Sequence, residues 1–149
     1  MKVLIIALLI SVSFSFDTEK AIEYARTYCS TYNKYYKDYR SEGGGEDANF
    51  VSQCLIAGGL DLEGCGGRDE KGAIPSVTGL RNCLNLKGWK NTYGISKRFK
   101  AGYPFFDGYS HAMLITSING RTITYCGHIT DRCDRPMIPP GNYYYYYLP

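Results

Sequence analysis

Apolar positions recur with a helical period in the first part of the chain. The first such segment begins at Asp17 or Thr18, either of which can cap a helix, and its apolar residues fall on one face. These residues are Ala21, Ile22, Ala25, Tyr28, Cys29 and Tyr32. The spacing predicts one amphipathic helix at the start of the folded part of the chain.

Two further helices are predicted downstream. Residues 48–57 form a largely apolar run that ends at a glycine pair, and Glu46 and Asp47 precede it. Acidic groups are favoured there because the N-terminal end of a helix carries partial positive charge. Residues 76–87 show a similar amphipathic pattern and also end at a glycine.

The rest of the chain favours strands. Residues 111–118 and 121–128 are rich in β-formers, and the Asn-Gly pair between them is the strongest short signal for a type I′ hairpin. A last strand is predicted over 142–148, and a polar loop over 131–136. Helices followed by an antiparallel sheet predict an α+β fold.

The predicted hairpin brings together the two histidines of the chain. If Ile118 pairs with Arg121, His111 lies opposite His128, with Cβ atoms about 4.5 to 5.5 Å apart. Two imidazoles at that distance can share a proton, a ligand or a metal ion. The pair is therefore half of a candidate site.

The N-terminal segment has the features of a secretory signal peptide. Residues 1–16 have a basic start, a short apolar middle and an end rich in small residues. The apolar run is shorter than the about 20 residues that a transmembrane helix needs. We therefore expect cleavage near Ser15 or Phe16, and one extracellular domain over 17–149 with no membrane span.

The charge balance argues against nucleic acid as a partner. The formal net charge is +3 and falls to +2 with the leader, which carries Lys2 and no acidic residue. Basic and acidic residues are interspersed, so no basic patch is predicted.

The cysteines favour disulfides, because their number is even and the chain is expected to be exported. They are Cys29, Cys54, Cys65, Cys83, Cys126 and Cys133. Sequence leaves the pairing open; only Cys126 with Cys133 is suggested locally, since the residues between them could loop back. None of the cysteines has the CxxC spacing of a structural zinc site, and no metal or other cofactor is predicted.

Three motifs carry a resemblance to a known family. Residues 44–59 read Gly-Gly-Glu-Asp-Ala-Asn-Phe-Val-Ser-Gln-Cys-Leu-Ile-Ala-Gly-Gly. They resemble the pattern Gly-Gly-Asp-Cys-Thr-Asn-Phe-Val-Ser-Gln-Cys-Leu of the putative amidase domain family. Residues 110–116 resemble the strand with that family's catalytic histidine, and residues 127–136 resemble its His-Thr-x-Asp-Arg motif. The family is similar to NlpC-type and CHAP-type cell-wall peptidases, which implies a papain-like fold with N-terminal helices packed on an antiparallel sheet.

The sequence departs from the family pattern at the nucleophile. Aligning Asn49 with the asparagine of the family places Asp47 at the position of the catalytic cysteine and Glu46 at that of the preceding aspartate. Cys54 does not replace the lost thiol, because seven residues along a helix span about 10 Å.

The resemblance also assigns roles to the polar residues. Asp47, His111 and His128 take the positions of the catalytic triad, with His128 expected to orient His111. Glu46, Asn49 and Asp131 border the site, and Asp131 is the candidate that orients His128. We expect the carboxamide of Asn49 to bond to that of Gln53, one helical turn away.

Three kinds of chemistry remain open for the triad positions. Asp47 and His111 can form an ion pair in a cleft that binds a peptide or a peptidoglycan-like glycopeptide without cutting it. They can instead activate water for amide hydrolysis. Two histidines and a carboxylate also match a metal-binding facial triad. We favour the first, a secreted pseudoenzyme.

A different class of function is suggested by the tyrosines at the C-terminus. Alternation along a strand sends Tyr143, Tyr145 and Tyr147 to one face, and Tyr144 and Tyr146 to the other. We favour a packing role, with one set in the core and one covering the sheet. An uncharged run at a sheet edge would instead promote self-association, as in a disulfide-stabilised structural protein.

Overall fold

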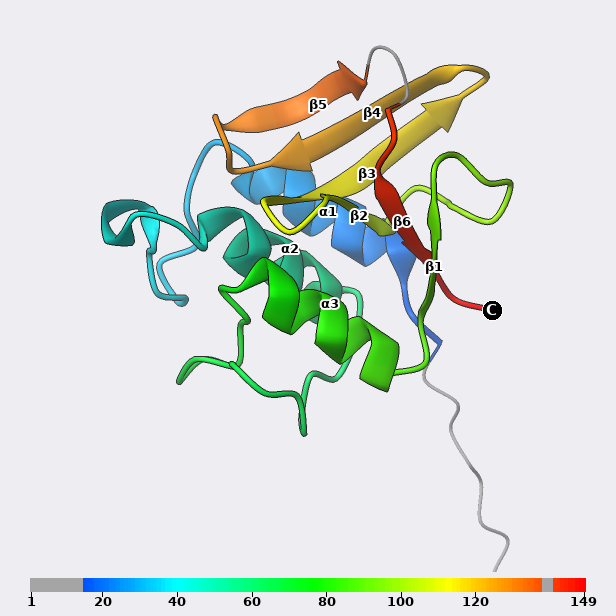
Figure 1. Ribbon diagram of the computed structural model, residues 1–149. Coiled ribbons are helices and arrows are strands. Elements are labelled where there is room, and N and C mark those ends of the chain that lie inside the picture. The colour runs from blue at the N-terminus through cyan, green and yellow to red at the C-terminus, as the bar shows by residue number, and fades with distance from the viewer. Residues whose placement is uncertain (1–14, 138–140) are drawn as a thin grey trace, which may run out of the picture.

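Helices and strands occupy separate layers. The structure, a computed structural model, describes residues 15–137 and 141–149. In this part of the chain three α-helices accompany one six-stranded antiparallel sheet (Figure 1). The α+β prediction is therefore confirmed. The predicted leader over 1–16 lies almost entirely outside the described residues.

The three predicted helices are present. α1 spans Thr18–Tyr28, and the side chain of Asp17 caps it by accepting a hydrogen bond from the backbone N–H of Lys20 at 3.1 Å. α2 spans Glu46–Ala57, and α3 spans Val77–Leu86. A 3₁₀ turn, η1, covers Arg40–Glu42. In the described part of the chain no helix is long and apolar enough to cross a membrane.

The sheet has the strand order β1-β6-β2-β3-β4-β5. Its strands are β1 Lys90–Tyr93, β2 Pro104–Asp107, β3 His111–Asn119, β4 Thr122–Gly127, β5 Arg132–Met137 and β6 Tyr144–Tyr147. α1 and α2 both contact β3, and α3 contacts α2. This packing places the N-terminal end of α2 beside the first residues of β3.

The predicted polar loop over 131–136 is wrong, because residues from Arg132 onwards form β5. β5 pairs with β4 at one edge of the sheet, and most of its side chains are exposed. An edge strand is held by its backbone bonds to one neighbour, so it needs no alternating apolar pattern.

The predicted hairpin register is also wrong. Asn119 pairs with Thr122, so the turn consists of Gly120 and Arg121. Gly120 has a φ of 59°, whereas Asn119 and Arg121 have negative φ, which fits a type II′ turn with glycine first. A bulge between Ile115 and Ser117 shifts the register further.

The two histidines are therefore not a cross-strand pair. His111 pairs with Asp107 of β2, and His128 follows the end of β4. On the far side of the bulge Leu114 pairs with Cys126, so the position opposite His128 is that of Ala112.

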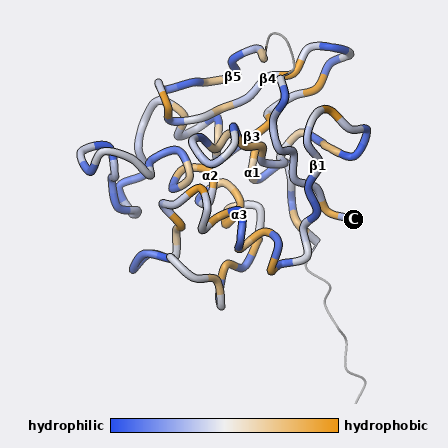
Figure 2. Tube along the Cα trace, viewed as in Figure 1, coloured by the Kyte–Doolittle hydropathy of each residue, from blue (hydrophilic) through white to orange (hydrophobic). Residues whose placement is uncertain are grey.

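The tyrosine-rich strand lies inside the sheet. β6 pairs with β1 on one side and with β2 on the other, so the idea that it forms a sticky edge is wrong. Tyr144 and Tyr146 contact the core between sheet and helices, and Tyr143 and Tyr145 contact a second cluster on the other face. The predicted face of Tyr147 is wrong, because Tyr147 lies in the helix-side core and not with Tyr143 and Tyr145. The packing role of the tyrosines is confirmed. Figure 2 shows hydrophobic segments gathered where helices and strands meet and hydrophilic ones in the outer loops.

Four of the cysteines form two disulfides, and the other two are free. Cys29 at the end of α1 pairs with Cys133 of β5, and Cys65 pairs with Cys83 of α3. The suggested bond between Cys126 and Cys133 is wrong, because the thiol of Cys126 points into the buried core and is free. Cys54 of α2 is also free and buried.

Candidate functional site

The site is built at the N-terminal end of α2. Gly45 precedes the helix with a φ of 96°, a conformation that L side chains rarely adopt, and a Cβ there would lie 2.6 Å from the backbone oxygen of Pro75. This close approach sets where the helix begins. The first two residues of α2 are Glu46 and Asp47, and both are buried.

The carboxylate of Asp47 joins α2 to β3. Its Oδ1 accepts a hydrogen bond from the backbone N–H of Ala48 at 2.9 Å, and its Oδ2 accepts one from the N–H of Ala112 at 3.0 Å. Oδ2 also lies 3.2 Å from Nδ1 of His111. Because an ionised carboxylate only accepts, Nδ1 of His111 carries the proton in this contact.

His111 remains accessible. Its side chain is 44% exposed, and it lines a cavity of about 240 Å³ on the side of the sheet away from the helices. Apolar and aromatic side chains form most of this cavity, with Asp107 and Arg132 as its charged groups. We refer to it as the His111 cavity. In neutral His111, with Nδ1 occupied by Asp47, the free lone pair is on Nε2.

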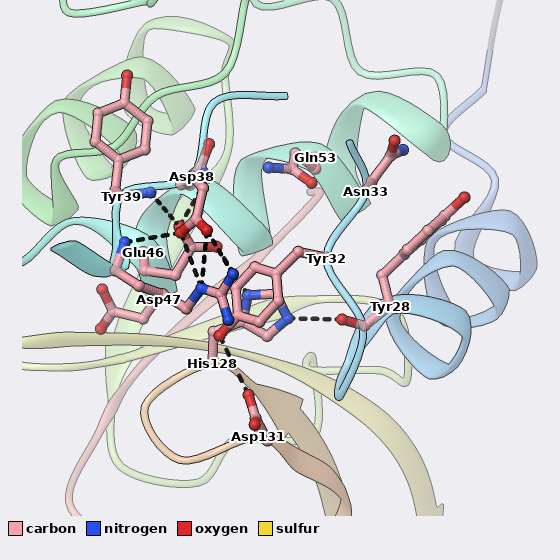
Figure 3. Close-up of polar contacts among 12 residues, drawn as sticks. Tyr28, Tyr32, Asn33, Asp38, Tyr39, Glu46, Asp47, Gln53, His128 and Asp131 are labelled. Atoms are coloured by element: carbon pink, nitrogen blue, oxygen red, sulfur yellow. Dashed lines mark hydrogen bonds and ion pairs between the residues drawn. The ribbon is translucent and has the colours of Figure 1, made fainter. Parts of the chain in front are cut away.

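His128 is held by a different acid. Its Nδ1 lies 2.9 Å from Oε1 of Glu46, and its Nε2 lies 2.6 Å from the backbone oxygen of Tyr28 (Figure 3). The side chain of His128 is 2% exposed, and its ring stacks on Phe50 at 3.9 Å and contacts Tyr32 at 4.4 Å.

The donors and acceptors around His128 fix where its protons lie. A carbonyl oxygen only accepts, so Nε2 donates to Tyr28 and carries a proton. A further proton must lie between Nδ1 and Glu46, since a bare nitrogen lone pair would otherwise face a carboxylate. His128 and Glu46 are therefore joined by a buried hydrogen bond between Nδ1 and Oε1.

This arrangement corrects two predicted contacts. Both ring nitrogens of His128 are occupied by Glu46 and Tyr28, so His128 does not orient His111. Asp131 does not orient His128 either, because it accepts a hydrogen bond from the hydroxyl of Tyr32 at 3.2 Å. The backbone oxygen of Tyr28 is a partner that no side-chain pattern could reveal.

Asn49 and Gln53 also differ from the prediction. Nδ2 of Asn49 donates to the backbone oxygen of Lys37 at 3.0 Å and to Oε2 of Glu46 at 3.2 Å. Gln53 accepts a hydrogen bond from the hydroxyl of Tyr24 at 2.7 Å. The two carboxamides therefore bond to other partners and not to each other.

The histidines do not form a metal site. Within residues 15–137 and 141–149, no group of three His, Cys, Asp or Glu side chains is placed to hold a metal ion. Asp47 contacts His111 whereas His128 contacts Glu46, so the facial triad considered from the sequence is wrong.

Cys54 is no substitute nucleophile. Its thiol is fully buried in the core, and burial raises its pKa well above the usual range. A thiolate, the reactive form, is therefore disfavoured.

Comparison with known protein families matches residues 15–103 to the putative amidase domain. The matched part includes Glu46, Asp47 and Asn49 and ends before His111. Searches of curated proteins and of solved structures gave no match.

Proposed function

The chain belongs to the putative amidase domain family, and from this premise we propose that it is a secreted binding domain that recognises a peptide or a cell-wall glycopeptide without hydrolysing it. In this proposal the scaffold is papain-like, and Asp47 stands where the catalytic cysteine of the family would be. His111 contributes to the recognition of the ligand.

One observation carries the proposal. Both oxygens of Asp47 already accept hydrogen bonds from backbone amides, and Oδ2 also faces His111. A carboxylate with these partners stabilises the contact between α2 and β3, and it is a far weaker nucleophile than a thiolate. The group that should attack the substrate therefore has a structural role.

The His111 cavity supplies the features of a binding site. Its apolar wall includes Phe105 and Met113, and its charged groups are Asp107 and Arg132. Polar atoms make up most of the exposed lining of this cavity although many of the side chains are apolar, and a peptide offers both kinds of surface. Two disulfides support an extracellular location, since such bonds persist in oxidising compartments.

A second candidate function is hydrolysis without a covalent intermediate. The contact with Asp47 holds the proton of His111 on Nδ1, which leaves Nε2 as a base that could activate water. Only backbone amides near the helix start would then be available to stabilise the developing oxyanion.

Titration calorimetry with disaccharide-peptide fragments of cell wall tests the binding proposal. We expect saturable binding to the native protein and an affinity about tenfold weaker or worse in His111→Ala. Asn119→Ala, at the exposed far end of β3, is the matched control and should bind normally. Equal affinity of His111→Ala and the native protein, or no binding at all, would contradict the proposal.

A further inference from the structure

A second cavity lies on the helix side of the site. Its volume is about 260 Å³, and its walls are α2 and the segment 32–40 that crosses it. The lining includes the rings of Tyr32 and Tyr36 and the carboxamides of Asn49 and Gln53. Figure 3 shows part of this region, with Tyr32 beside His128 and with Gln53 on α2. We refer to it as the carboxamide cavity.

Asn49 leaves a buried acceptor without a partner. The residue is 1% exposed. Its Nδ2 donates to the backbone oxygen of Lys37 and to Glu46, and both of these groups only accept. The amide orientation is thereby fixed, and the remaining atom is Oδ1, which is buried and has no hydrogen-bond partner. A buried carbonyl in this state costs about 1 to 3 kcal/mol.

Gln53 presents the complementary donor, and a chain of hydrogen bonds fixes its orientation. The backbone N–H of Tyr35 donates to Oδ1 of Asn33, so the Nδ2 of Asn33 must be the donor to the Tyr24 hydroxyl. Burial raises the pKa of that hydroxyl, which therefore keeps its proton and donates it to Oε1 of Gln53. The Nε2 of Gln53, a residue that lines the cavity, then has no hydrogen-bond partner in the described residues.

The charged groups of the carboxamide cavity are already paired, with the exception of Lys34. Arg40 bonds to Asp38 at 2.9 Å, which lowers the pKa of that carboxyl to about 2. Lys37 pairs with Glu42 at 2.8 Å. Glu46 pairs with His128, and the one remaining cation, Lys34, is exposed.

The two carboxamides therefore leave a neutral acceptor and a neutral donor unsatisfied, one helical turn apart on α2. We propose that the carboxamide cavity binds a neutral secondary amide group, which donates its N–H to Asn49 Oδ1 and accepts at its C=O from Gln53 Nε2. An amide offers one donor and one acceptor in a fixed plane, and Tyr32 and Tyr36 supply aromatic surface for the atoms attached to it. The volume suits a small ligand group and is below that of most drug-sized sites.

Two sources share this chemistry: the acetamido group of an N-acetylated amino sugar and the backbone amide of a peptide. This site is separate from the His111 cavity, so the inference does not depend on the proposed function.

The test is a nuclear magnetic resonance titration of the full mature chain labelled with nitrogen-15. The probes are N-acetylglucosamine and N-acetylalanine N-methylamide, with glucose as the sugar that lacks the amide. We expect at least one amide probe to shift the side-chain resonances of Gln53 and Asn49, and glucose to leave them unchanged. A response to N-acetylglucosamine alone identifies the sugar as the source, and a response to the peptide probe alone identifies the peptide.

Single substitutions distinguish the loss of a ligand contact from a general loss of folding. Gln53→Glu keeps the acceptor for Tyr24 and removes the donor, so we expect the responding probe to bind about tenfold more weakly or worse. Asn82→Asp, the same kind of exchange on the exposed face of α3, should bind normally. No shift with either amide probe, or an equal response to glucose, would overturn the proposal even if the native protein binds glycopeptides. Unchanged affinity in a folded Gln53→Glu variant would overturn it too.

Discussion

Asp47 connects two elements that are far apart in the sequence. Its two oxygens accept from the backbone amides of Ala48 and Ala112, and it orients His111. A buried carboxylate with these contacts contributes to folding as well as to the site. This structural role offers a physical reason why an acid is tolerated at the start of α2.

Replacing Asp47 by alanine should therefore destabilise the fold. Asp47→Ala leaves the buried N–H of Ala112 without its acceptor, and we expect the free energy of unfolding to fall by about 1 to 3 kcal/mol. Asp47→Asn keeps one side-chain oxygen and should cost less. Urea denaturation of both variants measures the difference, and a stability of Asp47→Ala equal to the native value would contradict the role assigned here.

The two free thiols should be inert in the native protein. Burial raises the pKa of Cys54 and of Cys126, so neither is expected to react with iodoacetamide until the chain unfolds. Mass spectrometry after timed alkylation, with and without denaturant, gives the answer. Rapid labelling of native Cys54 would show that this thiol is more accessible and more acidic than its position in the core implies.

At the scale of elements, the helices were the predictable part. The cap at Asp17, the acids before residue 48 and the glycines after α2 and α3 are local signals, and the structure confirms all three helices. Strand β5 and the register of the hairpin were not predictable in the same way. Strand β5 depends on backbone pairing with β4. The hairpin register depends on a turn and a bulge that local propensity does not specify.

In the site, too, the features marked by local sequence were predictable and those set by packing were not. Sequence pattern placed Glu46 and Asp47 at the start of α2, because helix ends are marked locally. It could not assign each histidine to its acid, since that choice depends on how β3 and β4 pack on α2. The partner of Asp131 depended on the position of Tyr32, which the helical pattern placed on the first helix but which lies beyond the end of α1 at Tyr28.

The start of α2 should depend strongly on Gly45. Gly43 and Gly45 both have positive φ, but only at Gly45 would a Cβ meet a neighbouring backbone atom, the oxygen of Pro75. We expect Gly45→Ala to lower the free energy of unfolding by about 1 kcal/mol or more beyond the effect of Gly43→Ala. Equal losses in chemical denaturation would mean that the approach to Pro75 does not constrain the helix start.

At the scale of the whole molecule, the disulfide between Cys29 and Cys133 ties the first helix to the edge strand β5. It closes a sequence separation of 104, whereas the bond between Cys65 and Cys83 closes 18. If a disulfide stabilises by lowering the entropy of the unfolded chain, the longer loop gives the larger stabilisation. The expected values are about 4 to 5 kcal/mol for the Cys29–Cys133 bond and about 3 kcal/mol for the Cys65–Cys83 bond.

Pairwise replacement by serine tests this difference. The variant without the Cys29–Cys133 bond should unfold at lower guanidinium concentration than the variant without the Cys65–Cys83 bond. The reverse order would indicate that strain or residual structure in the unfolded chain outweighs loop entropy.

We propose that this member of the putative amidase domain family binds without cutting because Asp47 stands where the family has its nucleophile. The most direct measurement is the rate of amide hydrolysis on cell-wall glycopeptides and simple amides, for the native protein and for Asp47→Cys. We expect no turnover by the native protein and measurable turnover by Asp47→Cys, with a thiol placed beside Nδ1 of His111. Turnover by the native protein that is abolished in His111→Ala would contradict the claim and show that the chain hydrolyses amides without a thiol.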